Sequence, residues 1–175
     1  MAQQALLERK RTHFVLWLPE PAASEPRLVI GRFQADTPPR LVDERVIPLV
    51  RAPDSNELWE VEASACGLRE DTVYHYWFER VDTLVYRTEH VPVRCTDPTA
   101  QCVDWRLTAN LGDDTSAASV VRYRNGRLEP SDPDSRPGFF TDSGAGADVP
   151  MASLPENRRL VIYEIAINDG LAIAV

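Results

Sequence analysis

Short apolar and aromatic stretches recur along the first half of the chain, and proline-containing polar sequences separate them. Residues 12–18 are mostly aliphatic or aromatic, and Pro-Glu-Pro follows them directly. Residues 27–33 are similar, and two consecutive prolines follow after a short loop. Because proline cannot donate a hydrogen bond to a strand ladder, both stretches are typical of strands. Residues 45–50 predict a third strand, and Pro48 indicates that it lies at a sheet edge or contains a bulge.

The clearest alternation of the chain lies at residues 72–80, which read TVYHYWFER. Successive side chains of a strand point to opposite faces of a sheet, so this pattern separates two sets of residues. One set is Tyr74, Tyr76 and Phe78, and the other is Val73, His75 and Trp77. If the first set faces the core, His75 and Trp77 lie on the opposite face, where they could form an open platform or a docking surface.

Further strands are predicted at residues 57–63, 84–87 and 90–94. Short strands at intervals of about ten residues, with no convincing helix between them, are the pattern of a β-sandwich. We therefore expect an all-β fold, with residues 1–108 forming the sandwich.

The remainder of the chain differs in character. Residues 120–128 predict a hairpin, because Asn125-Gly126 suits the positive φ angles of a tight turn. Pro, Gly, Ser and Asp then dominate up to residue 155, so we expect residues 109–157 to be a hairpin and a linker. A continuous apolar run at residues 158–167 favours a strand buried on both faces, as in a parallel sheet. One such strand cannot stand alone, so residues 158–175 are expected to be the truncated start of another domain.

Charge and cysteine content exclude several classes of function. A net charge of −8 argues against nucleic acid as a partner, because binding a phosphate backbone requires clustered Lys and Arg. No apolar run has the length of a signal peptide or a membrane helix, so we expect a cytoplasmic protein without a membrane partner. The three cysteines include no CxxC pair, so we expect buried free thiols and neither a disulfide framework nor a metal site.

Three segments, taken in order, resemble a known family. They are HFVLWLPEP at residues 13–21, VYHYWFE at residues 73–79 and TDPTAQCVDWRL at residues 96–107. Together they resemble the N-terminal accessory domain of the α-amylase superfamily, glycoside hydrolase family 13. The resemblance implies an immunoglobulin-like β-sandwich related to carbohydrate-binding module family 48, with an Asp-Pro-x-Ala element at residues 97–100.

The same resemblance extends to residues 161–164, Val-Ile-Tyr-Glu, which are similar to the first strand of the catalytic (β/α)8 barrel. The family's catalytic Asp and Glu residues lie at the ends of later barrel strands, so no catalytic residue and no cofactor are expected in this chain. We expect Glu164 to have a structural partner. After Glu164 the chain departs from the family and runs into a short apolar ending, which is why we expect a truncated and inactive product.

The resemblance implies a domain that supports a catalytic barrel and holds an α-glucan near it. Pyranose rings stack on exposed aromatic faces, and the candidates are Trp17, Trp59, Trp77 and Trp105, although aromatic residues of a sandwich are more often core. Trp77, together with His75, is the best candidate for carbohydrate binding because of its expected place on the outer face. The alternative is a free-standing immunoglobulin-like module that binds carbohydrate or protein and dimerises with a partner chain through its C-terminal segment.

Overall fold

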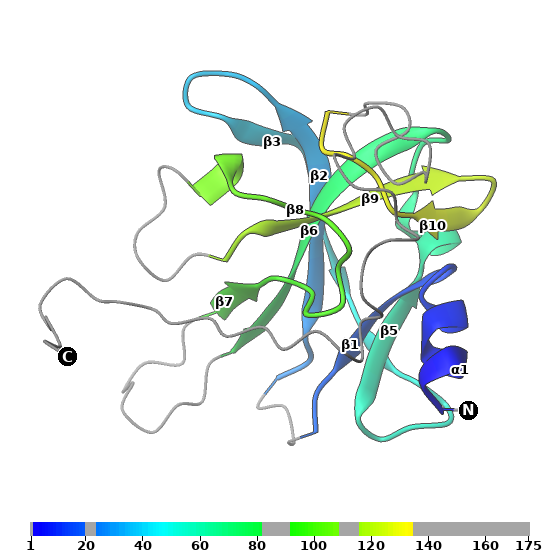
Figure 1. The fold of residues 1–175 in the computed structure, drawn as a ribbon. Coiled ribbons are helices and arrows are strands. Elements are labelled where there is room, and N and C mark those ends of the chain that lie inside the picture. The colour runs from blue at the N-terminus through cyan, green and yellow to red at the C-terminus, as the bar shows by residue number, and fades with distance from the viewer. Residues whose placement is uncertain (1, 20–23, 82–91, 109–115, 135–175) are drawn as a thin grey trace, which may run out of the picture. The chain divides into compact units, whose positions relative to one another are not determined.

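The computed structural model describes four stretches of the chain, residues 2–19, 24–81, 92–108 and 116–134 (Figure 1). All four belong to the first of two units into which the chain divides, Met1–Phe140 and Thr141–Val175. The expected strands at residues 84–87 and 158–167 and the apolar ending lie outside the described residues. No helix in the described stretches is long and apolar enough to cross a membrane.

The described part of the chain is mostly β-strand, as expected, and its strands form two antiparallel sheets (Figure 1). The three-stranded sheet has the order β1 (His13–Trp17), β5 (Leu58–Glu62), β4 (Val50–Arg51). The seven-stranded sheet has the order β10 (Arg127–Glu129), β9 (Ala118–Arg124), β6 (Thr72–Val81), β2 (Arg27–Gln34), β3 (Arg40–Pro48). Two short strands complete it, because β7 (Pro92–Cys95) pairs with β6 and β8 (Val103–Asp104) pairs with β9.

Helical structure in the described residues is limited to three short pieces. An N-terminal helix, α1 (Ala2–Arg9), precedes β1, and the sequence pattern had not indicated it. Two 3-10 helices, η1 (Ala63–Cys66) and η2 (Arg106–Thr108), follow β5 and β8 respectively. Only η2 bears on the site described below.

The main core lies between the two sheets. Phe14 and Leu16 of β1 and Trp59 of β5 belong to one buried cluster with the inward side chains of β2, β6, β9 and β10. The rings of Phe14 and Tyr76 meet edge to face at a centroid distance of 5.0 Å, and this contact joins the two sheets directly. The expected alternation in β6 is confirmed, because Tyr74, Tyr76 and Phe78 all enter this core.

The Asn-Gly pair forms a turn and Pro48 lies on an edge strand, as predicted, but the strand expected at residues 45–50 divides between β3 and β4. Pro48 ends β3, which is an edge strand, and the buried Leu49 then leads the chain to β4 in the other sheet. Asn125 and Gly126 have φ angles of 50° and 71°, which the turn between β9 and β10 requires.

The sheet extends beyond the expected boundary at residue 108. β9 pairs with β6 from Thr72↔Tyr123 to Tyr76↔Ser119, so the predicted hairpin is an integral part of the seven-stranded sheet. The expectation that the hairpin lies outside the sandwich is therefore wrong, because its first strand supplies a neighbour for the central strand β6.

Candidate functional site

His75 and Trp77 lie on the face of β6 opposite the main core, as the alternation predicts, but both side chains are buried. Their exposed fractions are 1% for His75 and 3% for Trp77. Trp77 packs with Leu107 and Ala118 in a second apolar cluster, and the guanidinium carbon of Arg94 lies 5.5 Å from its ring centroid. The expected open platform is therefore wrong for these two residues, because neither ring offers a face to a sugar.

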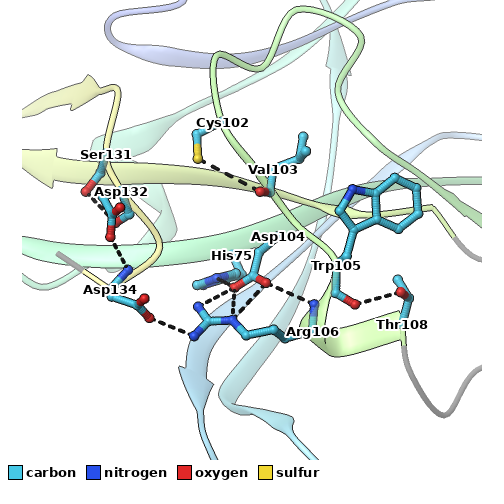
Figure 2. Close-up of polar contacts among 10 residues, drawn as sticks. All are labelled: His75, Cys102, Val103, Asp104, Trp105, Arg106, Thr108, Ser131, Asp132 and Asp134. Carbon is cyan, nitrogen blue, oxygen red and sulfur yellow. Dashed lines mark hydrogen bonds and ion pairs between the residues drawn. The ribbon is translucent and has the colours of Figure 1, made fainter. Parts of the chain in front are cut away.

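The cover over His75 comes from β8 and η2, which follow β6 far along the chain (Figure 2). His75 Nε2 lies 2.9 Å from Oδ2 of Asp104, the second residue of β8. Trp77 is fixed in the same region, because its indole Nε1 donates to the backbone oxygen of Ser116 at 2.8 Å. Each contact gives a hydrogen-bond partner to a ring nitrogen, His75 Nε2 or Trp77 Nε1, that would otherwise be buried without one.

Asp104 is the centre of this outer-face network. Arg106 donates to its carboxylate from Nε and from Nη2, at 2.9 and 2.6 Å, and the Arg106 backbone N–H donates to Oδ1 at 2.9 Å. Burial alone would raise the pKa of Asp104, but the hydrogen bonds from Arg106 and His75 outweigh burial and hold this pKa at about 2. Asp104 is therefore an anion across the physiological pH range.

Arg106 connects this carboxylate to the segment that follows β10. Its Nη1 donates to Oδ1 of Asp134 at 2.7 Å, and its guanidinium lies over the Phe33 ring at 4.1 Å from the centroid. The hydrogen bond with Asp104 raises the pKa of Arg106, so its charge is permanent. The result is a chain of alternating charges that ties β8, η2 and residues 130–134 together (Figure 2).

The protonation state of His75 follows from this network. Burial lowers the pKa of His75 despite the opposing effect of Asp104, so the ring is neutral at pH 7. An ionised carboxylate can only accept, so Nε2 carries the proton and donates it to Asp104. The buried Nδ1 is then an acceptor without a hydrogen-bond partner in the described structure.

A buried Asp-His pair suggests a catalytic triad, but the chemistry of its surroundings does not fit one. The nearby hydroxyls of Thr108 and Ser131 donate to the backbone oxygens of Trp105 and Asp132, and neither bonds to His75 (Figure 2). His75 is also inaccessible to a substrate at 1% exposure. The network therefore has a structural role: it holds β8 and η2 against the outer face of the seven-stranded sheet.

The exposed aromatic side chain of this region is Trp105, between Asp104 and Arg106 in sequence. Its side chain is 65% exposed, and Figure 2 shows the indole directed away from the carboxylate of Asp104. Its backbone oxygen accepts hydrogen bonds from both the N–H and the hydroxyl of Thr108. Trp105 thus combines an open ring with a fixed backbone.

The four tryptophans divide between core and surface. Trp59 and Trp77 are buried, whereas Trp17 and Trp105 are 58% and 65% exposed. Trp17 lies at the end of β1, and its Nε1 donates to the Glu57 carboxylate at 2.9 Å.

A second buried carboxylate, Asp97, lies at the start of the Asp-Pro-Thr-Ala sequence. Its Oδ2 accepts hydrogen bonds from the Tyr76 hydroxyl at 2.8 Å and from Lys10 Nζ at 2.6 Å. Its Oδ1 accepts from the backbone N–H of Thr99 at 2.8 Å, and its own N–H donates to Ser119 Oγ at 2.9 Å. The Asp97 carboxylate therefore joins the N-terminal region to the central strand of the seven-stranded sheet.

The described residues contain no group of three or more His, Cys, Asp or Glu side chains that could hold a metal ion. A cavity with a volume of about 460 Å³ lies beside Lys10. Sequence reasoning missed this cavity and both carboxylate networks, because each is assembled from segments far apart in the chain. No protein family, curated protein or solved structure matches the chain.

Proposed function

We propose that this chain is the N-terminal accessory domain of an α-amylase-superfamily enzyme, glycoside hydrolase family 13. The observation that carries the proposal is the contact between two of the segments on which the resemblance rests. Tyr76, in the VYHYWFE segment, donates its hydroxyl at 2.8 Å to Asp97, the first residue of the Asp-Pro-x-Ala element. Each segment alone is a weak pattern, but the two depend on each other in the fold. Asp97 is buried, and its carboxylate needs the hydrogen bond that Tyr76 donates.

Strand connectivity supports an immunoglobulin-like arrangement in this proposal. The chain starts in the three-stranded sheet with β1, enters the other sheet with β2 and β3, returns with β4 and β5, and crosses again to β6. Such crossings between two antiparallel sheets around one core are typical of immunoglobulin-like sandwiches. The proposed first barrel strand at residues 158–167 lies outside the described residues. Strand connectivity therefore supports the immunoglobulin-like sandwich and does not bear on the barrel.

In this proposal the domain holds an α-glucan through Trp105, and the buried Trp77 and His75 support that surface from below. A pyranose ring packs against an aromatic face that is both open and rigid, and Trp105 is 65% exposed. The adjacent Arg106 is held by Asp104 and Asp134, so the backbone on both sides of the indole is ordered before a ligand binds. Catalysis belongs to the barrel, and the chain alone is inactive.

Affinity electrophoresis in gels containing amylose or glycogen tests the glucan role. We expect the protein to be retarded, and Trp105→Ala to migrate as in a gel without polysaccharide. Trp17→Ala is the matched control, because Trp17 is 58% exposed and lies at the end of β1 in the three-stranded sheet.

Two outcomes would remove Trp105 from the proposal. One is retardation of Trp105→Ala equal to that of the unaltered protein, and the other is an equal loss in Trp17→Ala. No retardation of the unaltered protein by either polysaccharide would leave support of the barrel as the proposed role and exclude glucan binding. Circular dichroism spectra of both variants should match the unaltered protein, because each replaces an exposed side chain.

A further inference from the structure

The edges of the two sheets meet beside α1 and then separate. The backbone N–H of Leu128 in β10 donates to the backbone oxygen of Arg11, two residues before β1, at 2.7 Å. In the described residues no further backbone hydrogen bond joins β1 to β10, because β1 pairs with β5 and β10 pairs with β9. The separation of the two edges leaves a cavity of about 460 Å³. Cavities that bind small molecules commonly have volumes of about 300–1,000 Å³.

The apolar part of the cavity wall belongs to the main core. Phe14, Tyr76, Val121 and Leu128 all line it, and all four side chains are buried members of that core. These residues come from β1, β6, β9 and β10, so a regular and rigid scaffold shapes the wall. The exposed apolar lining above these side chains includes Leu7, which is 54% exposed.

Lys10 supplies a positioned ammonium group at the same cavity. Its Nζ donates to Asp97 Oδ2 at 2.6 Å and to the hydroxyl of Thr99. A lysine ammonium has three N–H donors, so one remains after these two bonds. Lys10 is the only lysine among the 175 residues of the chain.

Arg127 adds a second cation to the cavity lining. Its side chain has no hydrogen bond or ion pair to any residue of the described structure, unlike Arg11, which lies 3.3 Å from Glu8. The lining includes three cationic residues, Lys10, Arg11 and Arg127, and one carboxylate, Glu129. This cationic lining contrasts with the net charge of −8 for the whole chain.

We propose that this cavity binds a small organic carboxylate with an aliphatic body. The carboxylate accepts hydrogen bonds from the free N–H of Lys10 and from an N–H of Arg127. The aliphatic body packs against the exposed apolar lining, which includes Leu7 at 54% exposure. Hydrogen bonds between ionised groups are about twice as strong as neutral ones, so the anionic head determines selectivity. The site is separate from Trp105 and does not depend on glucan binding.

Isothermal titration calorimetry with octanoate tests the site, and octanol of equal chain length is the uncharged comparison. We expect saturable binding of octanoate at millimolar or lower concentration and markedly weaker binding of octanol. Arg127→Gln should weaken octanoate binding about fivefold, because it replaces a charge-assisted hydrogen bond by a neutral one. Arg124→Gln, in the same hairpin but outside the lining, is the matched control and should leave the affinity unchanged.

Amide NMR spectra give the location independently. We expect octanoate to shift the backbone signals of Gln101 and Glu129, which line the cavity, and Ala100→Phe to abolish both shifts and binding by filling it. The proposal is overturned if octanol binds as tightly as octanoate, if Arg127→Gln binds as the unaltered protein does, or if the shifts lie elsewhere. Absence of saturable octanoate binding would also overturn it.

Discussion

Replacing Arg106 by Met tests whether the outer-face network holds the fold together. The substitution keeps a long apolar side chain but removes the guanidinium, which donates to Asp104 and Asp134 and lies over the Phe33 ring. Asp104 would then remain buried, with only His75 Nε2 and the backbone N–H of residue 106 as donors. An incompletely paired buried carboxylate destabilises the folded state.

The expected loss follows from two independent estimates. Breaking a buried ion pair by removing one partner costs about 3–5 kcal/mol, and the 40% exposure of the Arg106 side chain lets water recover part of that cost. The pKa of Asp104, held at about 2 against an ordinary value of 3.8, corresponds to about 2 kcal/mol of stabilisation of the anion. We therefore expect Arg106→Met to lower the free energy of unfolding by about 2–3 kcal/mol at pH 7.

The pH dependence has a defined sign. A carboxyl whose pKa is lower in the folded state stabilises that state above the unfolded pKa, here 3.8, and this stabilisation disappears as the pH falls through about 2. Because Arg106→Met lacks the main cause of the low pKa, its stability should fall less between pH 4 and pH 2 than that of the unaltered protein. The difference between the two proteins should therefore narrow in acid.

Urea unfolding followed by tryptophan fluorescence measures both effects, with equal m-values as the condition for comparison. Arg124→Met is the control, because Arg124 lies 3.9 Å from Asp71 with both side chains more than half exposed, and the expected loss is below about 0.5 kcal/mol. Equal losses in the two variants would show that the contacts of Arg106 with Asp104 and Asp134 do not stabilise the fold. A difference between Arg106→Met and the unaltered protein that stays constant from pH 7 to about pH 2 would refute its electrostatic basis.

Three further substitutions or reactions address the core. Tyr76→Phe should lower the free energy of unfolding in urea by about 1–2 kcal/mol, because Asp97 loses a donor. Tyr123→Phe is the control and should lower it less, because the Tyr123 hydroxyl has no hydrogen bond in the described structure. Equal losses would contradict the role of the Tyr76 hydroxyl. Gly31→Ala should lower the melting temperature, because its Cβ would lie 3.0 Å from the backbone oxygen of residue 42, and an unchanged value would contradict the close approach. Burial raises the pKa of the Cys66 thiol to about 11, so iodoacetamide should modify Cys66 at pH 8 only on unfolding. Peptide mapping distinguishes Cys66 from the partly exposed Cys95 and Cys102, and rapid labelling of Cys66 in the folded protein would contradict its burial.

The sequence was most informative where a local pattern has one structural solution. The alternation at residues 72–80 predicts which side chains of β6 enter the core, because strand geometry allows only two faces. The Asn-Gly pair predicts the β9–β10 turn for a similarly local reason.

The cover on the outer face could not be predicted in this way. Alternation places His75 opposite the core, but Asp104, which buries it, lies 29 residues later in a strand of only two residues. Neither its pairing with β9 nor the two contacts of Arg106 leaves a periodic signal in the sequence. The exposure of Trp105 depends on the same arrangement, which is why the sequence favoured the buried Trp77 instead.

The Lys10–Asp97 contact shows the same limit, because 87 residues separate its partners. The Asp-Pro-x-Ala sequence predicts a local turn, and Asp97 does accept from the Thr99 N–H two residues later. The contacts of Asp97 with Tyr76 and Lys10 form only in the folded chain, and so does the cavity beside them. A local sequence pattern therefore predicts neither.

We propose that this domain belongs to an enzyme with a catalytic (β/α)8 barrel. Sequencing the coding DNA that follows the codon for Val175 is the decisive test of this proposal. We expect alternating strand and helix patterns downstream, with the Asp and Glu residues of a glycoside hydrolase at the ends of later strands. Downstream sequence without such a pattern in any reading frame would contradict the proposal.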